Sequence, residues 1–210
     1  MLASYPMAHY VNARVQLQGG PVIAHYLALT VEQSVFGHHT FALHVSFAAL
    51  GKALGLKQDL VHMRAHEQLG GQNVAISWEA QAPGAPRSGA PAPFEFKGVI
   101  TETSIQTSHD LTQYYHIGGH SHSFLVDSGV QRRTFVKKSL ADIVQQVLAP
   151  YPVNALPREV NPARTAPLPY VVQYGESNYQ FLQRLAAQYG EWLFFDGKTL
   201  HFGRCPRPTP

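Results

Sequence analysis

The chain has 210 residues, of which 45% are hydrophobic and 14% are charged. This length suits one domain or two small ones, and the apolar fraction can supply a core, which argues against disorder throughout the chain. The formal net charge is +3, and no run of like charges is longer than a pair. Without a basic stripe the sequence lacks the electrostatic footprint of a nucleic-acid-binding protein, so no nucleic-acid partner is expected.

Cysteine content and the N-terminal sequence bear on the compartment. Cys205 is the single cysteine, which excludes an intrachain disulfide and a cysteine-based zinc site. The first fifteen residues lack the basic start and apolar segment of a secretory signal, and the sequence has no apolar run of 18 residues. We therefore expect a protein made in the cytoplasm and not exported by a cleaved signal peptide.

The first half of the chain is predicted to be mainly strand. Phe41, Leu43, Val45 and Phe47 alternate with smaller or polar residues, which is typical of a half-buried strand. Similar patterns predict strands at residues 11–17, 40–47, 73–78, 94–102, 103–109 and 111–117, with a partly helical segment at 54–69. The first 125 or so residues are therefore expected to form a β-barrel or sandwich with a small helical insertion.

The second half contains clearer helix signals. The apolar spacing predicts helices over residues 139–149 and 177–189, the first capped by Ser139 and the second followed by Gly190. The Asp196-Gly197 pair between two apolar runs predicts a hairpin with a type I′ turn. Prolines gather at 83–93, 150–169 and the last five residues, which predicts a long loop, a linker and a tail.

Histidines are the most suggestive candidates for chemistry. His116, His120 and His122 lie close in the sequence, and an H-x-H pair on a strand can present two imidazoles to zinc. The alternative is that they are ordinary strand and turn residues, and this is favoured because no nearby carboxylate completes the site. The rival interpretation, a metal-dependent enzyme using these three histidines, stays open at this point.

Other catalytic patterns are missing from the sequence. It has no G-x-S-x-G elbow, no phosphate-binding loop and no identifiable pair of catalytic carboxylates. No catalytic residue, resident metal or cofactor is therefore predicted. A third interpretation is a carbohydrate- or ligand-binding β-barrel module, for which Tyr114, Tyr115 and Trp192 would supply aromatic contacts.

The segment 170–203 carries a distinctive pattern. An aromatic strand is followed by a Glu-Ser pair, a helix with Phe-Leu-x-Arg-Leu, a glycine and a second aromatic strand. This pattern resembles the VgrG spike proteins of type VI secretion systems and the related late-control D proteins of contractile phage tails. The residues that match are Gln173, Tyr174, Glu176, Ser177, Phe181, Leu182, Arg184, Leu185 and Gly190.

A second stretch extends the resemblance upstream. Residues 119–129 resemble a family stretch in which a strand ending Gly-Tyr-Ser-Pro leads to an aspartate, with His120 and His122 in the places of the tyrosine and proline. The helix that follows resembles the family form K-[ST]-L-x-D-I-V, most closely that of Bacteroidetes-type VgrG proteins. The matching helix positions include Ser139, Leu140, Asp142 and Ile143.

The resemblance implies a fold, an arrangement of domains and an assembly. The fold is expected to be mainly β with a few helices, with a first β-barrel-like domain at 1–135, a helix and proline-rich linker at 136–169, and the start of a second, truncated barrel at 170–210. In the family this region trimerises into a ring that continues the inner tube. The scarcity of charge suits such a ring, because its sheets need one face for the core and one for neighbouring subunits.

The same resemblance implies a role and partners. The protein is expected to be a structural, non-enzymatic part of a contractile injection machine, exported by that machine. Its expected partners are copies of itself, the inner-tube and baseplate proteins and effectors, with the target membrane reached only through the assembled spike. Glu176 is expected to sit near the dipole of the second helix, while Arg184 is either an exposed helix charge or an ion-pair partner across a subunit boundary.

Overall fold

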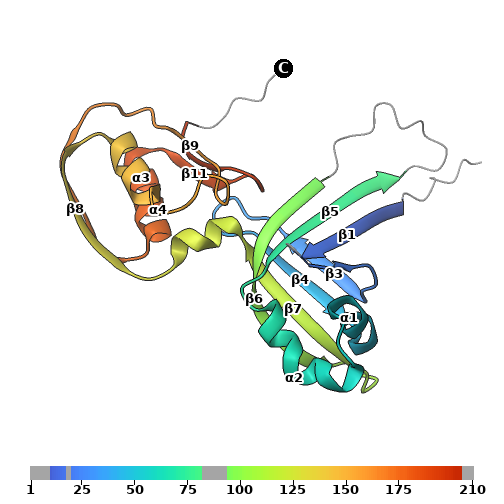
Figure 1. Ribbon diagram of the computed structural model, residues 1–210. Helices are drawn as coiled ribbons and strands as arrows, with labels where there is room; N and C mark the ends of the chain where they lie inside the picture. The colour runs from blue at the N-terminus through green and yellow to red at the C-terminus, as the bar shows by residue number, and fades with distance from the viewer. Residues whose placement is uncertain (1–9, 18–19, 82–93, 205–210) are drawn as a thin grey trace, which may run out of the picture. The chain divides into compact units, whose positions relative to one another are not determined.

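The elements of the chain divide between two compact units (Figure 1). The computed structural model describes residues 10–17, 20–81 and 94–204, so the predicted loop at 83–93 and the tail after residue 205 lie outside the described residues. The first unit comprises residues 1–30 and 41–119, and the second comprises 31–40 and 120–210. The boundary expected at residue 135 falls inside a strand of the second unit, because that strand pairs with one from segment 168–176.

A seven-stranded sheet forms the framework of the first unit, in the order β2-β1-β5-β6-β7-β4-β3. Alternation of buried and half-buried side chains in β4 shows why these residues form strands, since one face packs into the core. The strands are β1 (Tyr10–Leu17), β2 (Val22–Ile23), β3 (Ala28–Glu32), β4 (Thr40–Val45), β5 (Asn73–Gln81), β6 (Phe94–Thr107) and β7 (Gln113–Ser121). The buried apolar residues of this face include Val15, Leu43, Ile76, Phe96 and Ile117.

Two helices pack with this sheet, α1 (Phe47–Leu54) and α2 (Gln58–Leu69), and α2 lies along β6 (Figure 1). The prediction that Phe47 ends a strand is wrong, because Ser46 caps a helix there by accepting a hydrogen bond from the Ala49 amide at 3.3 Å. The predicted helical segment at 54–69 is confirmed for α2.

A single long strand replaces two predicted ones in the middle of the chain. The break expected after residue 102 is absent, and β6 continues to Thr107. The chain turns instead between Ser108 and Thr112, where the Asp110 carboxylate accepts from the Thr112 amide at 3.3 Å. Leu111 was expected in a strand but takes a left-handed conformation with φ 63° in this turn.

The second unit places two helices between two small sheets (Figure 1). One sheet pairs β8 (Gln131–Lys138) with β10 (Leu168–Glu176), and the other has the order β11-β12-β9. The remaining elements are the 3-10 helix η1 (His122–Asp127), α3 (Leu140–Leu148), β9 (Arg158–Asn161), α4 (Asn178–Tyr189), β11 (Trp192–Phe195) and β12 (Leu200–Gly203). The predicted linker thus contains α3 and β9, and β9 pairs in parallel with β12.

Both predicted helices of this unit are confirmed, and so is the final hairpin. The prediction of a type I′ turn in this hairpin is wrong. Asp196 does not take a positive φ, because its carboxylate accepts hydrogen bonds from the amides of Lys198 and Thr199 at 2.8 and 2.7 Å. Within the turn residues 196–199, Gly197 is the residue with a positive φ, at 99°.

The expected fold class, mainly β with a few helices, is confirmed. Among the described residues the sheets are not closed into a barrel, so the barrel-like units are open sheets with helices packed on them. The helices in this part of the chain include none that is both long and apolar enough to cross a membrane.

Candidate functional site

The residues of the segment 170–190 join strand β10 to helix α4 through an ion pair. Arg184 donates from Nη2 to Glu176 Oε1 at 2.6 Å and from Nε to Oε2 at 3.1 Å. Its Nη2 also donates to the Val172 carbonyl at 2.7 Å, and the guanidinium lies 5.2 Å from the ring centre of Phe181. Arg184 was expected to be either an exposed helix charge or an ion-pair partner across a subunit boundary. The structure shows an ion pair within its own subunit instead.

Helix α4 begins with a complete capping box. The Ser177 hydroxyl accepts from the Gln180 amide at 3.1 Å, and the Gln180 side chain accepts from the Ser177 amide at 3.0 Å. Gln173 is fully buried, and its amide donates to the Ser177 carbonyl at 3.2 Å and to Asn178 Oδ1 at 3.0 Å. A buried amide of this kind fixes where the strand meets the helix, since leaving it unpaired would be costly.

Asp127 connects the two stretches that carry the resemblance. The Ser177 hydroxyl donates to Asp127 Oδ1 in a short hydrogen bond. Asp127 is the aspartate that ends η1, and Ser177 is the cap of α4, so residues 50 positions apart meet here. Asp127 carried no signal of its own beyond its place in the upstream stretch.

The apolar members of the pattern build the core of the second unit. Helix α3 has its own capping box between Ser139 and Asp142, in which the Asp142 amide donates to the serine hydroxyl at 3.1 Å. Gly190 ends α4 in a left-handed conformation with φ 69°. The fully buried apolar members of the pattern are Leu140, Ile143, Phe181, Leu182 and Leu185.

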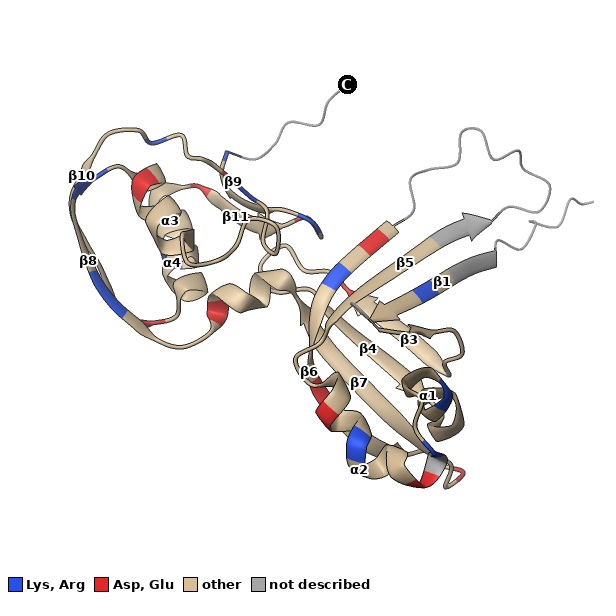
Figure 2. Ribbon diagram, in the orientation of Figure 1, with Lys and Arg blue, Asp and Glu red and all other residues tan. Residues whose placement is uncertain are grey.

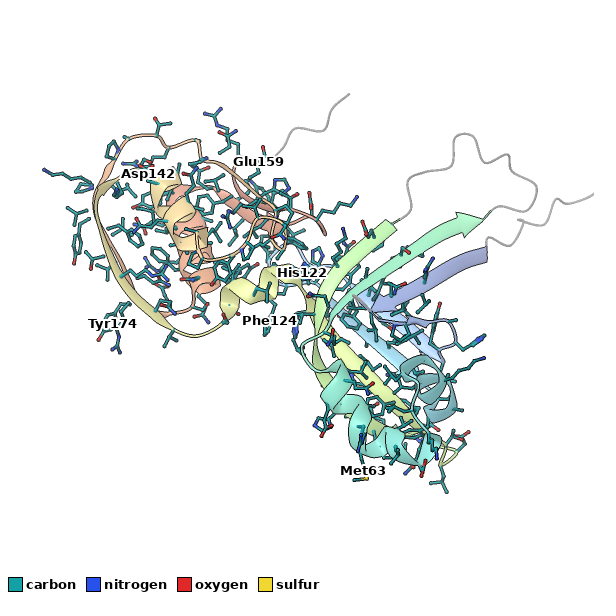
Figure 3. All side chains as sticks on the ribbon, in the orientation of Figure 1. Met63, His122, Phe124, Asp142, Glu159 and Tyr174 are labelled. Carbon is teal, nitrogen blue, oxygen red and sulfur yellow. The ribbon has the colours of Figure 1, made fainter. Side chains whose placement is uncertain are left out.

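Tyr174 is the exception among these residues, because 75% of its surface is exposed. It belongs to the outer face of strands β8 and β10, which we define as Arg132, Thr134 and Val136 of β8 with Tyr170, Val172 and Tyr174 of β10. Figure 3 shows the Tyr174 side chain directed away from α3 and α4. The opposite face, which includes Phe135 and Val171, packs into the core.

The outer face of β8 and β10 is apolar, aromatic and bordered by positive charge. Tyr170 lies opposite Val136 in the register, and these side chains are 62% and 55% exposed. Arg132 lies opposite Tyr174 and places its guanidinium 5.3 Å from that ring centre. Figure 2 shows further basic residues along β8. Exposed patches of this composition are typical of protein interaction surfaces.

The three histidines considered as metal ligands have different surroundings. His116 belongs to the first unit and lies with its ring centre 5.2 Å from that of His44. His120 belongs to the second unit and stacks on Phe124 at 4.3 Å, and His122 begins η1. Within residues 10–17, 20–81 and 94–204, no group of three or more His, Cys, Asp or Glu side chains is arranged to hold a metal ion.

A serine, a histidine and an aspartate do meet in the second unit. His38 Nδ1 lies 2.9 Å from Ser123 Oγ, and His38 Nε2 lies 3.5 Å from Asp127 Oδ2. Ser123 has no exposed surface, and its hydroxyl is also bonded to that of Ser121 at 2.9 Å. A nucleophile needs access to its substrate. The Ser123 hydroxyl is therefore inaccessible to a substrate in this structure and is bonded within the protein.

The aromatic residues proposed for ligand binding are also used differently. Tyr115 is 2% exposed and belongs to the core of the first unit. Tyr114 donates its hydroxyl to Gln106 at 3.0 Å, and Trp192 lies in the second unit with 44% of its surface exposed. The described residues of these strands do not form the closed barrel that this interpretation requires.

Several solved structures have a similar fold. The 43 kDa tail protein of prophage MuSo2 from Shewanella oneidensis has a TM-score of 0.62 and 17% identity, over 94% of this chain and 56% of that one. An Escherichia coli component of the type VI secretion system, described as similar to the phage T4 tail proteins gp27 and gp5, has a TM-score of 0.58 and 16% identity, over 90% and 48%. The Francisella PdpA-VgrG complex matches with a TM-score of 0.60 and 12% identity, over 98% and 33%.

These neighbours are longer than the chain described here, which spans about a third to just over half of each. A search of curated proteins found no match. The sequence profile of the phage tail baseplate hub (GPD) family matches residues 40–207, which include parts of both units and all the motif positions. The chain therefore belongs to the phage tail baseplate hub family.

Proposed function

We propose that this chain is a structural hub component of a contractile injection machine of the VgrG type, in which three copies join the inner tube to the puncturing spike. Family membership and the similarity to tail and type VI secretion proteins support the proposal. The observation that carries it is the outer face of β8 and β10, where Tyr170, Val136 and Tyr174 are left exposed on a paired sheet.

The outer face is the proposed contact with a neighbouring copy. A closed ring of identical subunits needs a surface on each copy that the next copy covers. Tyrosine and arginine are the residues most enriched at the centres of such contacts, and Tyr174 and Arg132 already hold each other in place there. Covering Tyr170 and Val136 would remove apolar surface from water, which stabilises the assembly.

The remaining partners follow from the same role. In the proposed machine the ring meets the inner-tube and baseplate proteins, and it carries effectors, as the PdpA-VgrG complex of Francisella suggests. The protein would be assembled in the bacterial cytoplasm and exported by the machine, reaching a target membrane only as part of the spike.

A non-enzymatic role is part of the proposal. The Ser123, His38 and Asp127 arrangement has a buried serine, and the polar motif residues Gln173, Glu176 and Arg184 bond to one another or to backbone. The Gln173 amide nitrogen, the Glu176 carboxylate and the Arg184 guanidinium each have partners within the second unit. Because most residues of the pattern serve the structure of the second unit, we propose that the exposed Tyr174 serves assembly.

Light scattering of the purified protein tests the proposed contact. We expect wild-type protein to reach the mass of three copies, and the double variant Tyr170→Ser, Tyr174→Ser to remain a monomer, because the exposed aromatic area is lost. The matched control is Leu27→Ser, which removes an exposed apolar side chain, 61% exposed, from the first unit.

A second measurement tests the hub role without requiring that this chain forms a trimer by itself. Pull-down of the inner-tube protein by the wild type, and its loss in the double tyrosine variant, would support the hub role. A protein that stays monomeric and never associates with tube or baseplate would contradict the proposal. So would a double variant that assembles as well as the wild type.

A further inference from the structure

Residues 31–40 are separated in sequence from the unit to which they belong. This segment comprises the last two residues of β3, the loop after them and the first residue of β4, and it groups with the second unit. Its Phe36 carbonyl accepts from Gln183 of α4 at 3.0 Å. The amide of His39 donates to Ser121 Oγ at 3.2 Å, and the Ser121 amide donates to the His39 carbonyl at 2.8 Å. We call residues 31–40 the strap.

A directed chain of hydrogen bonds holds the strap at His38. Ser121 Oγ accepts from the His39 amide, so its own hydrogen is available for Ser123 Oγ at 2.9 Å. Ser123 then donates to His38 Nδ1 at 2.9 Å, and the hydrogen on Nε2 faces Asp127 Oδ2 at 3.5 Å. When the His38 imidazole is neutral with its hydrogen on Nε2, both serine hydroxyl hydrogens have an acceptor, and the Nε2 hydrogen faces the Asp127 carboxylate without forming a hydrogen bond to it.

Protonation of His38 reverses the direction of this chain. A second hydrogen on Nδ1 must be donated to Ser123 Oγ, which then has to turn its own hydrogen toward Ser121. Ser121 already accepts from the His39 amide, and both serines have no exposed surface. One hydroxyl hydrogen is then buried without an acceptor, which is unfavourable.

Other groups around His38 act in both directions. Burial is the largest influence and lowers the pKa of His38 below its ordinary value of 6.5, while Asp127 of η1 raises it and His120 of β7 and the adjacent His39 lower it. The ring of Tyr179 from α4 lies 4.1 Å away and cannot supply a charge at neutral pH. The lowering of the His38 pKa by burial is therefore larger than the raising by Asp127.

His39 is a second titratable group on the strap. It is 3% exposed, its Nδ1 lies 3.4 Å from Gln33 Nε2, and its ring centre lies 5.6 Å from that of Phe195. Burial lowers the pKa of His39, and the backbone of Ser34 and Phe195 and the charge of Asp196 oppose that change only in part. Both histidines of the strap therefore resist protonation while it stays in place.

We propose that His38 and His39 make residues 31–40 an acid-sensitive strap, closed on the second unit while both imidazoles are neutral and released when they are protonated. Because the closed segment lowers both pKa values, its contribution to stability is fully present above pH 6.5 and is lost as the pH falls through the lowered values.

Hydrogen exchange followed by mass spectrometry tests the strap in the intact protein. After correction for the pH dependence of intrinsic exchange, we expect peptides covering residues 31–40 to open more often at about pH 5.5 than at about pH 7.5. Each pKa unit between the open and closed segment makes opening about tenfold more favourable in acid. Peptides from α3, which has no histidine, should change little.

Variants separate the strap from general acid destabilisation. His38→Gln keeps a donor and an acceptor without a titrating group, and we expect it to reduce the pH response of the strap, with the double variant His38→Gln, His39→Gln abolishing it. The control His25→Gln, which removes an exposed histidine of the first unit, should respond as the wild type does.

The proposal is overturned if exchange of residues 31–40 is the same at both pH values, or if His38→Gln keeps the full wild-type response. Should His38→Gln fail to fold at neutral pH, the wild-type protein still decides the question. An NMR titration of the His38 ring protons with a midpoint at or above 6.5 would exclude the strap.

Discussion

Arg184 and Glu176 form a two-point ion pair across the turn between β10 and α4, with contacts of 2.6 and 3.1 Å. The Glu176 carboxylate raises the pKa of Arg184, chiefly through these hydrogen bonds, so the guanidinium is charged at every pH at which the protein is folded. The same guanidinium donates to the Val172 carbonyl, so one side chain of helix α4 bonds both to strand β10 and to the residue that ends it.

Replacing Arg184 tests this relationship. We expect Arg184→Ala to lower the free energy of unfolding of the second unit by about 1–2 kcal/mol, a modest figure because the arginine side chain is 44% exposed. Arg184→Lys should recover less than half, because an ammonium group cannot make two parallel bonds to a carboxylate. Urea unfolding measures both, and an Arg184→Lys variant equal to wild type would contradict the two-point role. Arg64→Ala, an exposed arginine on α2, is the control.

The two serine caps should differ in their contribution to stability. Ser139→Ala removes a cap bonded within its own helix, and we expect a loss of about 1 kcal/mol. Ser177→Ala removes a cap and also the donor to Asp127, so the expected loss is about 2 kcal/mol. Thermal and urea unfolding of the two variants measure the difference. Equal losses would mean that the bond to Asp127 contributes nothing.

Adjacent glycines of β7 provide a matched pair in the first unit. A Cβ at Gly119 would lie 2.1 Å from the Val99 carbonyl oxygen and 2.6 Å from Phe41, whereas one at Gly118 would meet the end of the His116 side chain at 3.1 Å. We therefore expect Gly119→Ala to destabilise the first unit by about 3 kcal/mol or to prevent folding, and Gly118→Ala to cost about 1 kcal/mol or less. Circular dichroism and urea unfolding report the result, and a well-folded, stable Gly119→Ala would show that the sheet can shift there.

The final hairpin should weaken in acid. Burial opposes ionisation of Asp196, but hydrogen bonds from Thr199, His201 and Lys198 outweigh it and lower the pKa of Asp196 below 3.8. The stabilisation is thus present above pH 3.8 and is lost as the pH falls through the lowered pKa. Asp196 is 44% exposed, so we expect a loss of less than about 1 kcal/mol.

Asp196→Asn tests the origin of that acid response. The amide oxygen can still accept from the backbone of Lys198 and Thr199, so the hairpin should form at neutral pH without the carboxylate's titration. Unfolding measured between about pH 5 and pH 3 should therefore depend less on pH in the variant. An identical pH dependence in both proteins would assign the acid response to other carboxylates.

Local signals in the sequence are sufficient for the helices of the second unit. Ser139 and Asp142 lie three residues apart and form the predicted capping box, and Gly190 follows α4 as expected, because caps depend only on residues within one turn. The apolar stripe of each helix also lies in the core. The start of helix α1 at Phe47 was missed, because the alternation that precedes it predicted a continuing strand.

Contacts between residues far apart in the sequence could not be predicted from such local patterns. The parallel pairing of β9 with β12 joins Val160 to Phe202, and β9 lies where prolines predicted a linker. The Ser123 to His38 bond spans 85 positions, and nothing in the residues near either end indicates the other. The exposure of Tyr174 also needed the structure, since a buried and an exposed aromatic look alike in an alternating strand.

The strap has a consequence for the order in which the protein folds on the ribosome. Phe36 is synthesised 147 residues before its partner Gln183, so at about 5–20 residues per second it emerges roughly 7–30 s earlier. The bonds of the strap to Ser121 and Ser123 span 82 and 85 positions and become possible earlier, whereas its bond to α4 must wait for the full 147. Expression of residues 120–210 alone would accordingly lack one piece of its own unit, and supplying residues 31–40 as a separate peptide should complete it.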